Sequence, residues 1–352
     1  MDDGSGMDDT DDTPAVAGWA HRPGYLDTAA YGLPHPASAA AMNRWTAEWT
    51  GGATAYPDWL GATDEARQLF ALLAGVPEDR VCTGVTGSQL VGQLATSLPD
   101  GSRVLAAADE FPSLLFPFLA QADRGVRVRE VPIERIADEI DATTDVVALS
   151  AVSPMDGRLA PLGDIRRAAA ATGARTVVDA AQACGWLAED WSRYDAVVVP
   201  GFKWLCALRG VAFMALSDRM LGEQRPSSAG WFAGVRRSAG VRPLRQSPDA
   251  RSLDLSPVWS SWAAAREGLR ALLALGVPRI GAHDVGLADR LRHGLGAEPG
   301  ETPIVIVAGV AAAERLRRSG LRVTMRKDHA RVAFHVYNAP ADVDRALEAV
   351  AS

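Results

Sequence analysis

A lysine and an aspartate stand at the ends of two apolar runs that are typical of buried strands. Lys203 follows the run 196–199 in the segment YDAVVVPGFKWLCALRG, and Asp179 ends the run 176–178 in VVDAAQACG. Burying both charges is costly unless something compensates them. Pyridoxal phosphate would do so, because its aldehyde forms a Schiff base with a lysine and its pyridinium nitrogen pairs with an acid. The sequence therefore predicts a pyridoxal-phosphate site around Lys203 and Asp179.

Further polar or aromatic residues follow other predicted strands. One loop consists of the small residues Thr86, Gly87 and Ser88. This loop opens a helix, whose free N–H groups suit a phosphate, although many such turns bind nothing. Phe111 could lie flat on a cofactor ring, although a lone phenylalanine is more often part of a core. Gln182 offers an amide to the phenolic oxygen of the cofactor. Asp179 has a simpler alternative role, since an aspartate after a strand commonly caps the next helix.

The elements that must position these residues alternate along the chain. Strands are predicted at 81–82, 103–107, 126–131, 146–150, 175–179, 195–199 and 211–216. Helices are predicted at 36–50, 57–74, 88–97, 114–122, 133–140 and 163–172. Continuous apolar strands that alternate with amphipathic helices predict an α/β fold, with a mostly parallel sheet sandwiched by helices. In such sheets ligands bind at the carboxyl ends of the strands, where all the residues above are placed.

The C-terminal part of the chain follows a different pattern. An irregular stretch at 222–258 precedes helices at 259–275, 279–294, 310–319 and 340–351 and strands at 303–307, 321–325 and 331–336. This pattern predicts a smaller α+β domain. We expect three regions: a disordered acidic tail at 1–20, a large cofactor-binding domain at 21–260 and a small domain at 261–352. The segment near residue 25 is expected to contribute to the active site.

Composition and charge exclude several classes of protein. The 352 residues carry a net charge of -7, whereas a nucleic-acid binder would be basic. No apolar run reaches the roughly 18 residues of a membrane span, and the N-terminus lacks an export signal. The three cysteines predict reduced thiols in the cytoplasm. The six histidines lack metal-binding spacing, so no metal is expected. Both Met1 and Met7 fit as the start of translation.

In this order, the motifs resemble the class V aminotransferase family of pyridoxal-phosphate enzymes, which has the type I fold. That family includes cysteine desulfurases, selenocysteine lyases, isopenicillin epimerase-like proteins, kynureninases and C–S lyases. The resemblance runs from about Tyr25 to the C-terminus. It rests on the segments YLDTAAYG, VVDAAQACG, PGFKWLCALRG and RVAFHVYNAPADVDRALEAV. It implies pyridoxal 5'-phosphate as the cofactor, an amino acid or cysteine conjugate as the substrate, and a homodimer whose subunits share the active site.

The resemblance also implies a role for each matched residue. Lys203 would bind the cofactor covalently and shuttle a proton, and Asp179 would keep the ring nitrogen protonated. The cofactor contacts would be Thr86, Gly87 and Ser88 at the phosphate, Phe111 on the ring and Gln182 at the phenolic oxygen. Arg331 matches the arginine that clamps the substrate carboxylate, with a strand-surface arginine as the alternative. The chain departs from its relatives at Pro200 and Gly201, where small hydroxyl residues are common, and at Pro154 and Asp156, where an asparagine is common.

The reaction type follows from what the chain lacks. A desulfurase needs a thiol on a mobile loop well after the lysine, but no cysteine follows Cys206. We therefore expect a C–S lyase that acts on an S-substituted cysteine and releases a thiol, pyruvate and ammonia. The alternatives are an aminotransferase, an epimerase, a decarboxylating or deaminating enzyme of a specialised pathway, and a cofactor-binding protein without turnover. The candidates for the pocket wall are aromatic or histidine side chains: Tyr31, His35, Trp204, Trp231, Phe232, Trp259 and Trp262.

Overall fold

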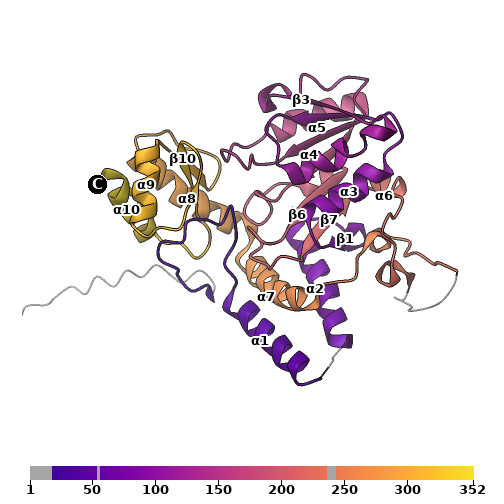
Figure 1. The fold of residues 1–352 in the computed structure, drawn as a ribbon, viewed down its shortest axis with the longest axis horizontal. Helices are drawn as coiled ribbons and strands as arrows, with labels where there is room; N and C mark the ends of the chain where they lie inside the picture. Colours follow the sequence, from indigo (N-terminus) through magenta and orange to yellow (C-terminus); the bar gives the residue numbers. More distant parts are fainter. Residues whose placement is uncertain (1–17, 54–55, 236–242) are drawn as a thin grey trace, which may run out of the picture.

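A seven-stranded sheet lies at the centre of the larger part of the protein, in a computed structural model that describes residues 18–53, 56–235 and 243–352 (Figure 1). Its strands are β1 (Val81–Gly84), β2 (Arg103–Ala107), β3 (Arg127–Val131), β4 (Val146–Ser150), β5 (Arg175–Asp179), β6 (Ala196–Pro200) and β7 (Ala212–Leu216). Their order across the sheet is β1-β7-β6-β5-β4-β2-β3. The predicted acidic tail lies outside the described residues up to position 17.

The sheet is mostly parallel, as predicted, and β7 is the strand that breaks the pattern. It pairs antiparallel with both β1 and β6. The cause is the connection from β6 to β7, which holds the predicted cofactor lysine and contains no helix. Without a helical crossover the chain cannot return to the starting edge of the sheet, so the next strand runs backwards. The strand pairing therefore leaves the lysine loop at the edge where the parallel strands end.

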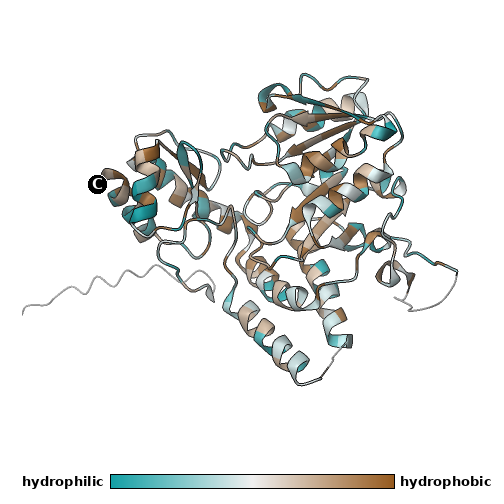
Figure 2. Ribbon diagram, in the orientation of Figure 1, coloured by the Kyte–Doolittle hydropathy of each residue, from teal (hydrophilic) through white to brown (hydrophobic). Residues whose placement is uncertain are grey.

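Helices cover both faces of the sheet, and two separate apolar cores result. One core lies under α2 (Tyr56–Ala74), α5 (Leu162–Thr172) and α7 (Trp259–Leu275), and the other lies under α3 (Gly87–Ser97), α4 (Pro112–Leu119) and α6 (Asp218–Gly222). The central strands are mostly hydrophobic (Figure 2), and β4 and β6 are buried along their whole length. Such continuous burial is what a sheet covered on both sides requires.

One predicted helix is absent. The segment 133–140 forms a single 3-10 turn at Ile133–Arg135 and then irregular turns. Its isoleucines still contribute to the core, since Ile136 and Ile140 are buried. Eight residues with three β-branched side chains form a helix of marginal stability. In addition, the guanidinium of Arg129 donates a hydrogen bond to the carbonyl of Glu139 at 2.9 Å. This hydrogen bond favours the turn over a helix.

A second, three-stranded antiparallel sheet is formed by the C-terminal part of the chain. Its strands, in the order β8-β10-β9, are β8 (Ile304–Ala308), β10 (His329–Ala333) and β9 (Thr324–Met325). Helices α8 (Val277–Gly294), α9 (Val310–Arg318) and α10 (Pro340–Ala351) pack on it (Figure 1). Tyr25 and Asp27 form bridges to Arg322 and Ala333, so the N-terminal segment pairs with this unit rather than with the large sheet. The domain division at residue 260 remains a prediction.

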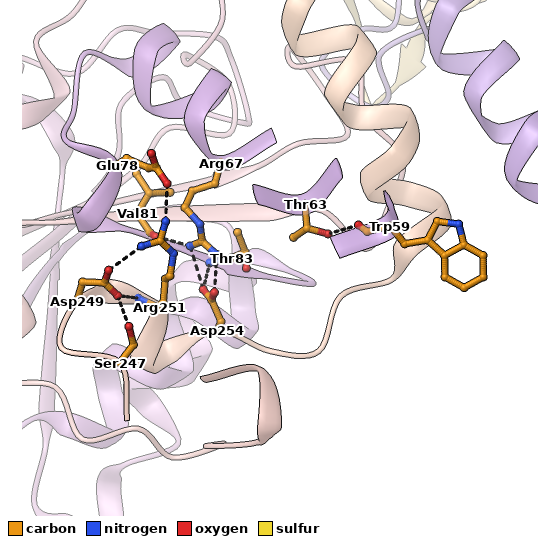
Figure 3. Close-up of polar contacts among 10 residues, drawn as sticks. All are labelled: Trp59, Thr63, Arg67, Glu78, Val81, Thr83, Ser247, Asp249, Arg251 and Asp254. Atoms are coloured by element: carbon orange, nitrogen blue, oxygen red, sulfur yellow. Dashed lines mark hydrogen bonds and ion pairs between the residues drawn. The ribbon is translucent and has the colours of Figure 1, made fainter. Parts of the chain in front are cut away.

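A buried ion pair ties the irregular segment before α7 to the large sheet (Figure 3). Arg67 of α2 forms hydrogen bonds to both carboxylate oxygens of Asp254, at 2.5 and 3.2 Å, and to the carbonyl of Val81 at 2.6 Å. Asp254 also accepts the N–H of Thr83 at 2.8 Å. These contacts join α2, β1 and the segment that leads into α7. α1 (Pro36–Thr50) packs against α7. Over the described ranges, no helix is both long and apolar enough to cross a membrane.

Candidate active site

The loop after β6 places Lys203 at the carboxyl edge of the sheet. Its backbone is tightly packed, because the N–H of Gly32 donates to the carbonyl of Phe202 at 2.9 Å. A Cβ atom at position 32 would lie 1.9 Å from the Lys203 carbonyl oxygen, so only glycine fits there. Cys206 has φ of 51°, a left-handed conformation that is unusual for a residue other than glycine. The N-terminal segment thus helps to fix the lysine loop.

Lys203 and Asp179 are both buried and influence each other electrostatically. Burial lowers the pKa of the Lys203 amine to about 8, and Asp179 opposes that change. Burial likewise raises the pKa of Asp179, and the positive charge of Lys203 counteracts the rise. One oxygen of Asp179 accepts the N–H of Ala181 at 2.8 Å, and the other has no hydrogen bond within the described chain. Asp179 therefore supports the following turn and keeps one oxygen for a further partner.

The loop before α3 lies beside the lysine loop. Thr86 caps α3 by accepting the N–H of Gln89 at 3.2 Å, and its hydroxyl lies 3.2 Å from that of Ser88. A Cβ atom at Gly87 would lie 2.9 Å from the ring of Pro200, so glycine is needed where the two loops meet. The helix N-terminus then offers free N–H groups to an anion.

Gln182 connects three parts of the site. Its carbonyl oxygen accepts the indole N–H of Trp204 at 2.8 Å, and its amide nitrogen donates to the carbonyl of Ala29 at 2.9 Å. An amide nitrogen carries two hydrogens, so one donor of Gln182 is still available. These bonds fix the orientation of the amide beside the cavity.

Phe111 and Glu110 stand together after β2. The ring of Phe111 lies 5.6 Å from the Lys203 amine, measured to the ring centroid. Glu110 accepts the backbone N–H of Ser150 at 2.6 Å and its hydroxyl at 2.5 Å. Burial raises the pKa of Glu110 to about 7, and the charge of Asp179 adds to this rise. The Glu110–Ser150 contact joins the ends of β2 and β4.

Arg331 lies in the middle of β10 and is buried. It donates to the carbonyl of Pro154 at 2.5 Å, and Thr324 lies 3.4 Å from its second terminal nitrogen. Its Nε is buried without a hydrogen-bond partner among the described residues. Burial lowers the pKa of Arg331 to about 10, so the guanidinium remains charged at neutral pH. Arg331 therefore stands directly behind a residue of the cavity wall and is not part of the lining itself.

One cavity of about 240 Å³ brings the other predicted site residues together. Its lining includes Thr86, Gly87, Ser88, Phe111, Asp179, Gln182 and Lys203. None of the seven predicted wall candidates lines it. Trp204 and Trp262 are buried in the core, and Trp259 lies against the tilted ring of Trp59. The aromatic walls of the cavity are instead Phe111 and Phe202.

Several lining residues have no role that is predicted from the sequence. Ser150 and Phe202 line the cavity, and so does Arg209, whose guanidinium carbon lies 4.4 Å from the centroid of the Phe202 ring. The available signal was one charged residue in the otherwise apolar segment after Lys203. Glu110 stands next to Phe111 in the sequence, but its bonds to Ser150 depend on the neighbouring strand. The spacing of residues along the sequence does not reveal a contact between two different strands.

The residues present fit pyridoxal phosphate. The side-chain amine of Lys203 forms no hydrogen bond within the described chain, and Asp179 keeps an unpaired oxygen in the same cavity. The glycine beside Pro200 leaves room for a phosphate at the start of α3. The set thus offers an amine for the aldehyde, an acid for the ring nitrogen and N–H donors for the phosphate.

Comparisons with known proteins show the family of the chain. The family model "Aminotransferase class-V" matches residues 61–305. A kynureninase of Deinococcus radiodurans is 27% identical over 324 residues, which cover 87% of this chain and 78% of that protein. An isopenicillin N epimerase of Streptomyces clavuligerus is 28% identical over 68% of this chain and 65% of that protein.

A similar fold is found in a cystine C–S lyase, C-DES, whose structure was solved with its product cysteine persulfide. It superimposes with a TM-score of 0.84 at 18% identity and covers 94% of this chain and 98% of that one. The likeness shows the type I fold, with the mostly parallel sheet and the smaller antiparallel sheet described above. The chain belongs to the class V aminotransferase family and is an enzyme that depends on pyridoxal 5'-phosphate.

Proposed function

We propose that this enzyme is a C–S lyase that acts on an S-substituted cysteine. The observation that carries the proposal is a buried lysine amine in a cavity whose lining contains no cysteine. The reaction would consume one water and break the bond between the β-carbon and sulfur. Its products are a thiol, pyruvate and ammonia. The similarity of fold to a cystine C–S lyase also supports this class of reaction.

The chain supplies an acid–base group suited to the first step. Because the pKa of Lys203 is about 8, a useful fraction of its amine is neutral near pH 8 and can take the α-proton of the substrate. The bound cofactor serves as the electron sink for the α-carbon. Asp179 favours that role by pairing with the protonated ring nitrogen. The proton held by Lys203 is then available to the departing sulfur.

The cysteines of the chain are unsuited to accepting sulfur. Cys82, Cys184 and Cys206 are all buried and unpaired. Burial raises the pKa of Cys184 to about 12 and that of Cys82 further still, so both remain thiols at neutral pH. Cys206 is buried beside His335 and is absent from the cavity lining. A persulfide would form only if a protein thiolate attacked the sulfur while it was still bonded to the substrate carbon, and no cysteine lines the cavity for this attack. The C–S bond would therefore break with the sulfur leaving as the thiol product.

Substrate binding and assembly are part of the same proposal. Arg331 would clamp the substrate carboxylate, which fits its charge and its unpartnered Nε. That role requires the Pro154 carbonyl to share or release its bond to Arg331 when the substrate binds. We further propose a homodimer, which light scattering of the purified protein would test. A monomer at assay concentration would contradict this part.

The decisive experiment offers S-substituted cysteines and cystine to the purified enzyme. We expect pyruvate and thiol to appear in equal amounts, with no need for a keto-acid acceptor. Formation of the pyridoxamine form with stoichiometric keto acid would instead identify an aminotransferase, and release of carbon dioxide a decarboxylase. Racemisation without cleavage would identify an epimerase.

Two variants sharpen this test. Cys206→Ser should keep the pyruvate yield, whereas a sulfur-relay enzyme would lose turnover. The chain has two lysines, Lys203 and Lys327, and Lys327 is exposed. Borohydride should therefore attach the cofactor to Lys203 alone, as mass spectrometry of peptides would show, and Lys327→Met should leave the product yield unchanged.

A further inference from the structure

The predicted phosphate-binding loop at the start of α3 contains no charged side chain. Thr86, Gly87 and Ser88 are neutral, and they offer only hydroxyl and backbone N–H donors. The charged residues of the cavity lining are Asp179, Lys203 and one further residue. A phosphate monoester carries close to two negative charges at pH 7, so an additional cation would strengthen its binding.

The third charged residue is Arg209. Its guanidinium carbon lies 4.4 Å from the centroid of the Phe202 ring, a distance typical of a cation–π contact. Its backbone is also held, because the hydroxyl of Ser261 donates to the Arg209 carbonyl at 2.9 Å. Within the described part of the chain, the guanidinium forms neither a hydrogen bond nor an ion pair. Arg209 therefore presents an oriented positive charge to the cavity, with no counter-ion among the described residues.

The order of the strands indicates that the guanidinium of Arg209 lies toward the end of the cavity formed by the start of α3. Pro200 ends β6 and Arg209 belongs to the connection from β6 to β7. β7 lies next to β1, which leads into α3. The ring of Pro200 packs close to Gly87 at the start of that helix. By contrast, Arg331 approaches the cavity through Pro154, which follows β4 on the other side of β5. The two guanidinium groups thus belong to different sides of the site.

We propose that Arg209, held by its contact with the Phe202 ring, is an anion ligand that binds the phosphate of the cofactor. A guanidinium suits this role because its N–H groups form a planar fork that matches phosphate oxygens. Phe202 would then have a role as well, because its ring contacts the guanidinium and orients it. The proposed role of Arg209 concerns cofactor binding alone and does not depend on which bond of the substrate is broken.

The test compares the affinity of the cofactor-free enzyme for pyridoxal 5'-phosphate and for pyridoxal, which lacks the phosphate. Quenching of tryptophan fluorescence measures both without any substrate. We expect Arg209→Gln to weaken the binding of pyridoxal 5'-phosphate about 10-fold and that of pyridoxal less than about 2-fold, since a partly exposed charged contact is lost. The inhibition constant of inorganic phosphate against pyridoxal 5'-phosphate should also rise about 10-fold in this variant.

A matched control is Arg127→Gln. Arg127 is an exposed arginine at the first residue of β3, at the opposite edge of the sheet, and its replacement should change neither affinity. Three results would overturn the proposal. They are unchanged affinity of Arg209→Gln for pyridoxal 5'-phosphate, equal losses for both compounds, and a higher KM for the substrate with unchanged cofactor binding. The last result would assign Arg209 to a substrate anion instead.

Discussion

Replacing the buried lysine should make the cofactor-free protein more stable. The pKa of the Lys203 amine falls from 10.5 to about 8 on folding, which means that the native state binds this proton less tightly than the unfolded chain. Below pH 8 the folded protein must bury a charge that the unfolded chain keeps in water. The cost is about 3 kcal/mol at pH 7 and falls to about 1 kcal/mol at pH 10, where the unfolded lysine also begins to lose its proton.

Methionine has a similar shape and no charge, so Lys203→Met stands in for the neutral amine. We expect this variant to be more stable than the wild type by about 3 kcal/mol at pH 7 and by about 1 kcal/mol at pH 10. Denaturant unfolding of the cofactor-free proteins at both pH values measures the two differences. Taking the difference between variants cancels the titration of groups that do not interact with Lys203.

Lys327→Met is the matched control, because Lys327 is exposed and its replacement should change stability by no more than about 0.5 kcal/mol at either pH. The reasoning is refuted if Lys203→Met is less stable than the wild type at pH 7. It is also refuted if the gain is the same at pH 7 and pH 10, since a gain from packing alone would not depend on pH.

Three further predictions concern the residues around the site. Arg331→Ala should lower kcat/KM for the amino-acid substrate at least about 30-fold and leave the visible spectrum of the bound cofactor unchanged, and normal turnover would contradict the carboxylate clamp. Arg67→Met should lower the free energy of unfolding in urea by about 3–5 kcal/mol, because Asp254 is left buried and unpaired. The double variant with Asp254→Leu should recover most of that loss. The pKa of Glu110 is raised from 4.5 to about 7, so the free energy of unfolding of the wild type should fall by up to about 3 kcal/mol as the pH rises across that window. Denaturant unfolding at about pH 5 and about pH 8 should show this fall in the wild type but not in Glu110→Gln.

Local patterns predicted most of the secondary structure because the strands are continuous apolar runs. The bounds of β4 and β5 coincide with the predicted ranges, since each apolar run stops at a polar residue, Ser150 or Asp179, at the carboxyl end of its strand. The segment 133–140 was predicted wrongly as a helix. Its apolar spacing correctly marks buried side chains, but a short segment can bury them from turns as well.

The site was predictable where one residue type serves one chemical purpose. Lys203 and Asp179 are expensive to bury, so their positions after apolar runs already suggested a cofactor. The aromatic wall candidates do not line the cavity of the described chain, because tryptophan also serves in cores, where Trp262 packs against Phe213. Arg209 was missed because its importance depends on the fold of the lysine loop, which brings a charge six residues past Lys203 back to the cavity.

The small C-terminal unit takes part in positioning the lysine. His335, which follows β10, is fully buried and binds Asp284 of α8 through Nδ1 at 2.7 Å. Despite its burial, the charge of Asp284 raises the pKa of His335 to about 10, so the imidazole stays protonated and donates from both nitrogens. Its Nε2 donates to the carbonyl of Trp204 at 3.1 Å, one residue beyond Lys203 and two before the strained Cys206. A cysteine keeps a left-handed backbone conformation only where the contacts around it hold that backbone in place. The sheet therefore brings the lysine to the cavity, but a charged pair from the other part of the chain helps to hold its loop in place.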